Sequence, residues 1–151
     1  MEGGQGKPGA LARPVPKPDA VSRGFWEATA RGELAIQRCD ACGRFQHPPR
    51  PLCSACGSTA LGFAQVSGQG RLWGWTVTHH SVAAGFEAAL PYTCMVVELA
   101  EQEGLFMLSD QVGREEMGKG LKRGMAMRVT FPPAPDGSAV LPQFAPAGRQ
   151  P

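Results

Sequence analysis

The sequence predicts a mainly β protein in which a short N-terminal helix and a metal-binding ribbon precede a five-stranded barrel. The ribbon is indicated by two Cys-x2-Cys motifs with ten residues between them. The barrel is indicated by apolar residues that recur at every second position from residue 68 onward, which is the period of β-strands. About a dozen residues separate the third and fourth of these strands. This connection fits a Greek-key barrel of the OB type, although periodicity alone also allows other small barrels.

Composition divides the chain into two tails and two folded parts. Residues 1–18 are rich in glycine and proline, so we expect a flexible tail, or one that becomes ordered only against a partner. Residues 19–66 should form the helix and the ribbon, residues 67–145 the barrel, and residues 146–151 a C-terminal tail. The N-terminal tail lacks the apolar core of a signal peptide, and no apolar run approaches the ~20 residues of a membrane span. We therefore expect a cytoplasmic protein.

The first regular element is a short helix over residues 22–31. Asp19 or Ser22 can cap its start, and Gly32 can end it. Its apolar residues fall roughly on one face, and they are Phe25, Trp26 and Ala30. Residues 33–38 then alternate as a strand that runs directly into the first cysteine.

The four cysteines Cys39, Cys42, Cys53 and Cys56 have the spacing of a tetrahedral four-thiolate site for Zn²⁺. A glycine follows each motif, and glycine takes the positive φ that such tight turns need. Four thiolates leave no coordination position for water, which favours a structural role over a catalytic one. Disulfides or free thiols are the alternative, but no secretory signal indicates an oxidising compartment. Iron also binds four sulfurs, and the red colour of a ferric site would distinguish it from zinc.

Three arginines lie beside or between the cysteines, at Arg38, Arg44 and Arg50. They either compensate the negative charge of a zinc tetrathiolate or bind a ligand. The net charge of the chain is +2: residues 1–60 carry eight basic and five acidic residues, and residues 61–151 carry seven and eight. A single-stranded nucleic-acid binder needs a positive groove along its barrel. Nucleic-acid binding is one hypothesis for function, and the slightly acidic barrel argues against it.

Residues 45–52 contain three prolines and should form an ordered loop between the cysteine motifs. Residues 61–66 leave the ribbon as a strand. The barrel strands are predicted at residues 70–80, 92–99, 105–110, 125–131 and 139–144.

The first barrel strand places Trp73, Trp75 and Val77 on one face, and Gly74 predicts a bulge or sharp bend within it. Residues 113–124 are expected to be a loop or one helical turn. The loop over residues 81–91 is the candidate for a mobile element at a ligand mouth or a partner interface.

Several short segments occur here in the order in which one family has them. They are Phe25-Trp26-Glu27, the four cysteines, Pro48-Pro49-Arg50-Pro51, Ser67-Gly68-Gln69-Gly70, Pro91-Tyr92 and Leu141-Pro142. Over residues 21–144, the chain resembles the acyl-CoA-associated proteins that join a rubredoxin-like zinc ribbon to an OB barrel. These proteins were long catalogued as a domain of unknown function.

The resemblance implies a non-catalytic accessory subunit of a hetero-oligomer. Members of this family pair with thiolase-like or lipid-transfer-protein-like enzymes, with aldolases, or with hydratases. Their partners make or break carbon–carbon bonds in acyl-CoA substrates. In such complexes the small subunit helps to form the acyl-CoA site, and the catalytic groups belong to the partner.

Seven residues are the candidates for contact with acyl-CoA or with the partner, namely Phe25, Trp26, Trp75, His79, His80, Phe86 and Tyr92. The two histidines end the first barrel strand. They can serve as an acid–base group or contact a CoA phosphate, and the alternative is a surface or interface pair. The aromatic residues can stack bases, hold an acyl or adenine group, or fill the core.

Cys94 is the only cysteine outside the ribbon, and its apolar strand favours a small core residue. A nucleophile needs a nearby base, and the sequence shows none. A rubredoxin-like redox protein is the third hypothesis for function. A stand-alone enzyme is the fourth, and it would need the nucleophile–base pair that the sequence does not show. His47 is not included among the metal ligands, because four thiolates already complete the shell.

Overall fold

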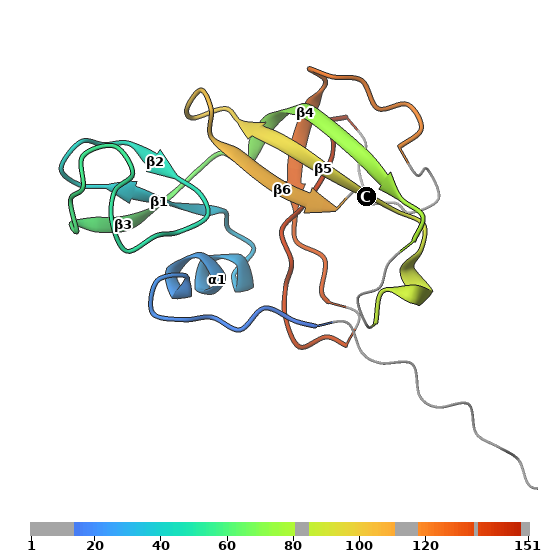
Figure 1. The fold of residues 1–151 in the computed structure, drawn as a ribbon, viewed down its shortest axis with the longest axis horizontal. Coiled ribbons are helices and arrows are strands. Elements are labelled where there is room, and N and C mark those ends of the chain that lie inside the picture. The colour runs from blue at the N-terminus through green and yellow to red at the C-terminus, as the bar shows by residue number, and fades with distance from the viewer. Residues whose placement is uncertain (1–13, 81–84, 111–117, 135, 149–151) are drawn as a thin grey trace, which may run out of the picture.

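Two antiparallel sheets and one short α-helix make up the fold (Figure 1). The computed structural model of the chain describes residues 14–80, 85–110, 118–134 and 136–148. The first sheet has the strand order β2-β1-β3, and the second has the order β6-β5-β4-β7-β8. The predicted mainly β class, with a helix, a ribbon and a five-stranded barrel, is confirmed. Parts of the predicted tails and of the loops over 81–91 and 113–124 lie outside the described residues.

Helix α1 (Arg23–Ala30) begins and ends within one residue of its predicted bounds. The carboxylate of Asp19 accepts hydrogen bonds from the hydroxyl and the N–H of Ser22, at 2.6 and 2.7 Å. These bonds lower the pKa of that carboxyl and fix the turn before the helix. The buried face comprises Phe25, Ala28 and Thr29. Ala30 is exposed, and its predicted place on this face is wrong, because five positions rotate it about 140° away from Phe25.

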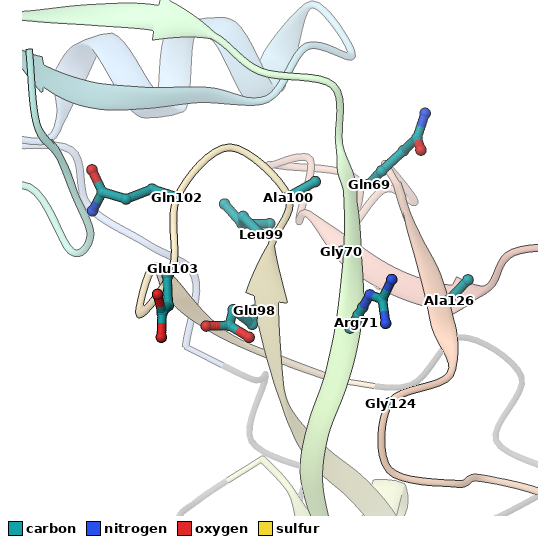
Figure 2. A pocket seen from close by; sticks show the side chains of 10 residues that line it. All are labelled: Gln69, Gly70, Arg71, Glu98, Leu99, Ala100, Gln102, Glu103, Gly124 and Ala126. Atoms are coloured by element: carbon teal, nitrogen blue, oxygen red, sulfur yellow. The ribbon is translucent and has the colours of Figure 1, made fainter.

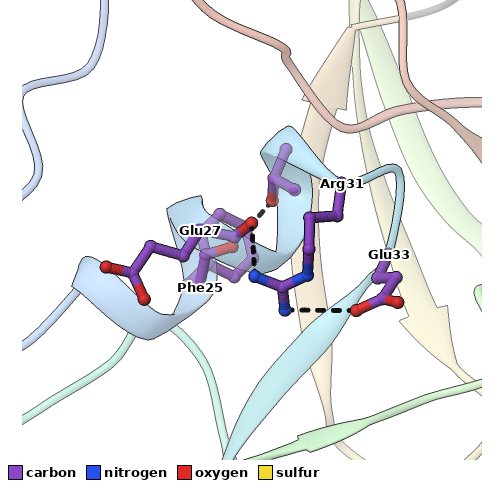
Figure 3. A network of polar contacts seen from close by, with 5 residues as sticks. Phe25, Glu27, Arg31 and Glu33 are labelled. Carbon is purple, nitrogen blue, oxygen red and sulfur yellow. Dashed lines mark hydrogen bonds and ion pairs between the residues drawn. The ribbon is translucent and has the colours of Figure 1, made fainter.

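Three polar contacts hold the C-terminal end of α1 (Figure 3). The hydroxyl of Thr29 donates to the carbonyl of Phe25 at 2.9 Å. The guanidinium of Arg31 donates to the carbonyl of Glu27 at 3.1 Å and pairs with the carboxylate of Glu33 at 3.2 Å. The Arg31–Glu33 pair is exposed, so it adds little to stability. It joins the end of the helix to the segment that enters the first sheet.

The first sheet is the ribbon, and its central strand carries the first cysteine. Strand β1 (Ala35–Cys39) lies between β2 (Phe45–Gln46) and β3 (Leu61–Gln65), and both neighbours are antiparallel to it. The predicted loop over residues 45–52 therefore begins with a two-residue strand. The strand prediction over residues 61–66 is confirmed to within one residue.

Two buried glutamines order the segment between the cysteine motifs. The Oε1 of Gln37 accepts hydrogen bonds from Nε2 of Gln46 at 2.6 Å and from the N–H of Arg50 at 2.8 Å. The Oε1 of Gln46 accepts one from the N–H of Ser54 at 2.9 Å. Since prolines cannot donate to a backbone ladder, these side chains supply the order that the sequence predicts for this loop.

The second sheet curls into the barrel and has the OB strand order. Its strands are β4 (Gln69–Thr78), β5 (Tyr92–Leu99), β6 (Phe106–Asp110), β7 (Ala126–Thr130) and β8 (Gln143–Pro146), and the short 3₁₀ helix η1 (Glu87–Ala89) precedes β5. Strands β6 and β8 lie at the two edges of the sheet. The N–H of Phe144 donates to the hydroxyl of Ser109 at 3.1 Å and thereby joins these edges.

The last strand starts later than predicted. Residues 139–144 were expected to form it, but β8 begins at Gln143. Val140 instead bridges to Pro133, and the N–H of Leu141 donates to the carbonyl of Pro132 at 3.0 Å. This segment therefore pairs with the residues after β7 before it enters the sheet.

A bulge in β4 decides where the tryptophans point. The pairing of β4 with β5 shifts between Leu72 and Gly74, as the glycine predicts. Leu72 is buried, whereas Trp73 and Trp75 are 46% and 40% exposed. Trp75 pairs with the buried Met95, but Trp73 falls at the bulge. The prediction that Trp73 shares one face with Trp75 and Val77 is therefore wrong, because the extra residue breaks the alternation.

One apolar core runs through the helix, the ribbon and the barrel. Ile36 of β1 belongs to the same buried cluster as Leu72, Met95 and Phe144 of the barrel. Because one core serves both parts, the ribbon is fixed to the barrel by apolar contacts as well as by the linker. Among the described residues, no helix has the length and apolarity that crossing a membrane requires.

Candidate metal centre

The four ribbon sulfurs already have the geometry of a metal site. All four lie within 4.8 Å of one another. The Sγ atoms of Cys39 and Cys56 are 3.7 Å apart, as are those of Cys42 and Cys53. A tetrahedral zinc with Zn–S bonds of about 2.3 Å places its sulfurs about 3.8 Å apart. Within the part of the chain that the structure describes, no other group of three or more such side chains is positioned to hold a metal ion.

The two cysteine turns have the same backbone geometry, which the sequence predicts. Gly43 and Gly57 adopt φ values of 74° and 73°. Their N–H groups donate to the carbonyls of Cys39 and Cys53, at 2.8 and 3.0 Å. A side chain at either glycine would be strained in this left-handed conformation. Local geometry therefore aims both sulfurs of each motif at one point.

The electrostatics of the sulfurs call for a cation. Backbone N–H groups, first that of Cys56, lower the pKa of Cys53 to about 6. The backbone of Ser58 lowers the pKa of Cys56, but the sulfurs of Cys39, Cys42 and Cys53 together with burial raise it further, to about 12. Sulfurs as close as these can all be ionised only when a cation lies among them. The donor set thus fits a zinc ion, which would cross-link the two turns.

Arg38 supports the first cysteine turn. Its Nε donates to the carbonyl of Gly43 at 3.0 Å, and its guanidinium lies 5.5 Å from the ring centroid of Phe45. The charge of Arg38 is thereby held beside the first motif. This position favours compensation of the thiolate charge over binding of a separate ligand.

The turn between β5 and β6 clamps the ribbon to the barrel. The side-chain amide of Gln102 accepts from the N–H of Phe45 at 2.9 Å and donates to its carbonyl at 3.1 Å. The carboxylate of Glu101 accepts from the N–H of Ser67, in the linker, at 2.7 Å. Gln102 therefore acts toward β2 as a neighbouring strand would. The sequence analysis missed this clamp, because 57 residues separate its two sides.

His47 lies where the ribbon meets the helix. Its ring centroid is 5.2 Å from that of Phe25, and its Nδ1 is buried with no hydrogen-bond partner among the described residues. Burial lowers the pKa of His47 to about 4. The imidazole is therefore neutral near pH 7, and its place is in the junction and not in the metal shell.

The seven predicted contact residues fall into two groups, and neither group lines the metal centre. Phe25 and Trp26 lie on α1, where their rings are 4.9 Å apart, and Phe25 is a buried core residue. The second group lies on β4, at the start of β5, or in the segment that connects them at the end of β4 far from the ribbon (Figure 1). It comprises Trp75, His79, His80, Phe86 and Tyr92. Phe86 and Tyr92 are in ring contact at 5.8 Å, and both histidines are exposed.

A concavity of about 550 Å³ lies where β4 and β5 meet the adjoining turns (Figure 2). Arg71, Glu98 and Glu103 are among its lining residues, and Figure 2 shows Arg71 pointing away from the two carboxylates. Its polar groups do not converge on one point. A ligand site needs convergent polar groups to orient its ligand, so this surface is not a candidate active site.

A second cavity, which we call the seam cavity, lies between the helix, the ribbon and the barrel. It has a volume of about 260 Å³. Its walls include Phe25 and Trp26 of α1, His47 of the ribbon, Leu108 of β6 and Leu141 before β8. This cavity brings a predicted contact residue, Trp26, next to residues that the sequence analysis did not select.

Cys94 is not an activated nucleophile. Burial and the nearby carboxylate of Asp110 raise the pKa of its thiol, and the distance from Sγ to the Asp110 oxygen is 3.9 Å. A reactive cysteine needs the opposite shift. The interpretation of Cys94 as a small residue packed in a strand is consistent with this environment.

Comparison with known proteins agrees with this geometry. Residues 26–62 match the ChsH2 rubredoxin-like zinc ribbon domain, and residues 64–132 match the ChsH2 C-terminal OB-fold domain. The chain belongs to the ChsH2 (DUF35) family. The predicted rubredoxin-like ribbon, the OB barrel and the Zn²⁺ cofactor are thereby confirmed.

Two curated proteins of this kind are similar in sequence. A DUF35 domain-containing scaffold protein of Pyrococcus furiosus is 31% identical over 112 residues, which cover 74% of this chain and 81% of that protein. A probable enoyl-CoA hydratase alpha subunit of Thermomonospora curvata is 37% identical over 147 residues, or 95% of this chain. The match covers 43% of the length of that hydratase subunit.

Two solved structures share the fold. A chain of the Ltp2-ChsH2(DUF35) aldolase superposes with a TM-score of 0.74 and 31% identity, covering 87% of this chain and 98% of that one. A DUF35 protein of unknown function from Sulfolobus solfataricus superposes with a TM-score of 0.57 and 14% identity, covering 85% and 86%. The second comparison shows the common fold alone.

Proposed function

We propose that this chain is a non-catalytic accessory subunit, which binds a thiolase-like or lipid-transfer-protein-like catalytic subunit and helps to form its acyl-CoA site. The observation that carries the proposal is the family match over both parts of the chain. Its relatives comprise a scaffold protein, a hydratase alpha subunit and a chain of an aldolase assembly. All three names describe a scaffold, a subunit or a component of an assembly, and two of them name enoyl-CoA hydratase or aldolase chemistry.

The described residues support a structural role for the metal. Four thiolates at tetrahedral spacing leave zinc no position for substrate or water. When bound, zinc supplies a cross-link between the two cysteine turns. The buried pair Gln37 and Gln46 orders the segment between the two cysteine turns. Gln102 fixes the ribbon to the barrel through its hydrogen bonds to Phe45. The ribbon and the barrel thus present one preformed surface to a partner.

A catalytic role for the chain alone lacks a suitable pair of groups in the described residues. Cys94 is held as a thiol, and Asp110 is a carboxylate that disfavours its ionisation. His79 and His80 follow the end of β4 and are exposed, so water screens them.

The test is co-expression of this chain with a lipid-transfer-protein-like subunit and, separately, with a thiolase-like subunit, each encoded nearby. We expect one of the two to co-purify with the chain in a fixed ratio. Acyl-CoA turnover should need the catalytic subunit and should rise when this chain is present. Turnover by this chain alone, or failure of both subunits to bind it, would overturn the proposal.

A further inference from the structure

A strip of exposed and half-buried apolar side chains lies on the outer face of the barrel. Phe106 and Leu108 alternate on β6 with the buried Met107, so they point outward. Leu108 lies directly opposite Val96 of β5, and the ring centroid of Trp73 is 5.1 Å from that of Phe106. We call Trp73, Val96, Phe106 and Leu108 the outer strip. Leu108 is 75% exposed, more than any other large apolar residue described.

The remaining outer face of the barrel is polar. Gln69 and Arg71 of β4 and Arg128 of β7 are exposed there, and Gln69 lies opposite Arg128 in the sheet. Apart from Trp75, the large apolar residues exposed on the described part of the barrel are Trp73 and Leu108, and both lie in the outer strip. An apolar patch with polar surroundings marks an interaction site on a protein surface.

Charge follows the same division. The four residues of the outer strip carry none, and charged groups occur at its margin. The guanidinium of Arg123 lies over Trp73, 4.5 Å from the ring centroid, and Asp110 ends β6. An uncharged centre with aromatic residues and a charged rim is the anatomy of a protein–protein interface.

The outer strip leads into the seam cavity. Leu108 belongs to both, and the cavity continues to Phe25, Trp26 and Leu141. Its volume of about 260 Å³ lies below the ~300 Å³ at which pockets for small molecules begin. The space suits one large apolar side chain and is too small for a whole acyl-CoA. His47 borders it as a neutral imidazole. Ser109, Asp110 and Gln143 also line it, so an apolar side chain would contact the apolar walls and leave a polar margin.

We propose that the outer strip and the seam cavity form the face on which the catalytic subunit docks, with one apolar side chain of that subunit inserted beside Leu108. This inference rests on the proposed function. The size of the cavity and the uncharged centre with its charged rim indicate a protein occupant. The solved relative that this chain matches over 98% of its length is part of an aldolase named for two components, so the occupant is the catalytic subunit. A second copy of this chain and a free acyl-CoA are the competing occupants.

The test measures the affinity of this chain for the subunit that co-purifies in the experiment above, by titration calorimetry. Leu108→Glu places a charge at the centre of the face, and Leu108→Ser removes the apolar anchor without adding charge. Ala126→Glu adds the same charge to the exposed polar side of the barrel and is the matched control. Zinc content and the thermal unfolding curve check that each variant folds.

We expect both Leu108 variants to lower the affinity at least about tenfold, as loss of a central anchor does, and Ala126→Glu to change it less than about twofold. Equal affinity of Leu108→Glu and the unchanged chain would overturn the inference while leaving the proposed function intact. A dimer of this chain that Leu108→Glu converts to a monomer would identify a second copy as the occupant, which also overturns it. Binding of acyl-CoA to this chain alone, abolished by Leu108→Glu, would overturn it as well. If no catalytic subunit binds the unchanged chain, the proposed function fails and the inference fails with it.

Discussion

The buried imidazole of His47 makes the stability of this protein depend on pH in a defined window. Burial lowers the pKa of His47 from 6.5 to about 4 in the folded chain, whereas the unfolded chain keeps the ordinary value. Below pH 6.5, the unfolded state therefore takes up a proton that the folded state refuses until about pH 4. The free energy of unfolding is unaffected above the unfolded pKa, falls as the pH drops through this window, and levels off below about pH 4.

The size of the effect follows from the shift. One pKa unit corresponds to about 1.4 kcal/mol, so the shift of His47 removes about 3 kcal/mol of stability between pH 7 and pH 4. Folded domains are typically stable by about 5–15 kcal/mol, so this loss is a large part of the total. Asp110, Arg44 and Arg50 line the cavities that His47 also lines. Because these charged residues are unchanged in a His47 variant, they cancel in a comparison of the two proteins.

Urea unfolding of the zinc-loaded chain and of His47→Gln at a series of pH values measures the contribution of His47 to the free energy of unfolding. The cysteine ligands also take up protons in acid, but they are identical in both proteins, so the difference between the two curves isolates His47. We expect the unchanged chain to lose about 3 kcal/mol more than His47→Gln between pH 7 and pH 4. Parallel loss in the two proteins would refute the assignment of a neutral, buried His47.

Three further substitutions test the metal centre, the clamp and the closest strand contact. Cys39→Ser should lose zinc and weaken the ribbon, and stoichiometric zinc in the purified variant would contradict the four-thiolate site. Gln102→Ala should lower the free energy of unfolding by about 1–3 kcal/mol, because it leaves the N–H and carbonyl of Phe45 without their partner; a urea curve unchanged from that of the parent chain would contradict the clamp. Gly70→Ala should destabilise by about 1–3 kcal/mol or more, since its Cβ would lie 2.5 Å from the carbonyl oxygen of Glu98. Gly74→Ala, on the same strand with no atom within 4 Å, should stay close to neutral, and equal melting temperatures for the two alanine variants would refute this reading.

Local signals in the sequence were sufficient for the ribbon ligands and for most strands. The two Cys-x2-Cys turns are closed by contacts between residues four apart in the chain, so their spacing alone specifies them. The near-continuous apolar run over residues 92–99 corresponds to β5 without any change of bounds. Even the bulge of β4 was marked by one residue, Gly74.

The direction of individual side chains was less predictable. A bulge adds one residue to a strand, and the alternation before it then no longer applies after it. Trp73 therefore lies beside Phe106 on the outside of the barrel, although its spacing from Trp75 suggested one common face. The residues of α1 show the same limit, because Ala28 and Thr29 form the buried face with Phe25, and Ala30 does not.

By itself, the sequence determined the four metal ligands, the ribbon and the positions of most barrel strands along the chain, because short-range spacing and the pattern of apolar residues encode them. Only the tertiary structure decided which surfaces these elements share. Gln102 reaches Phe45, His47 is buried against Phe25, and Leu108 meets the helix at the seam cavity. Each of these contacts joins segments far apart in the chain, and it exists only after the core has brought them together.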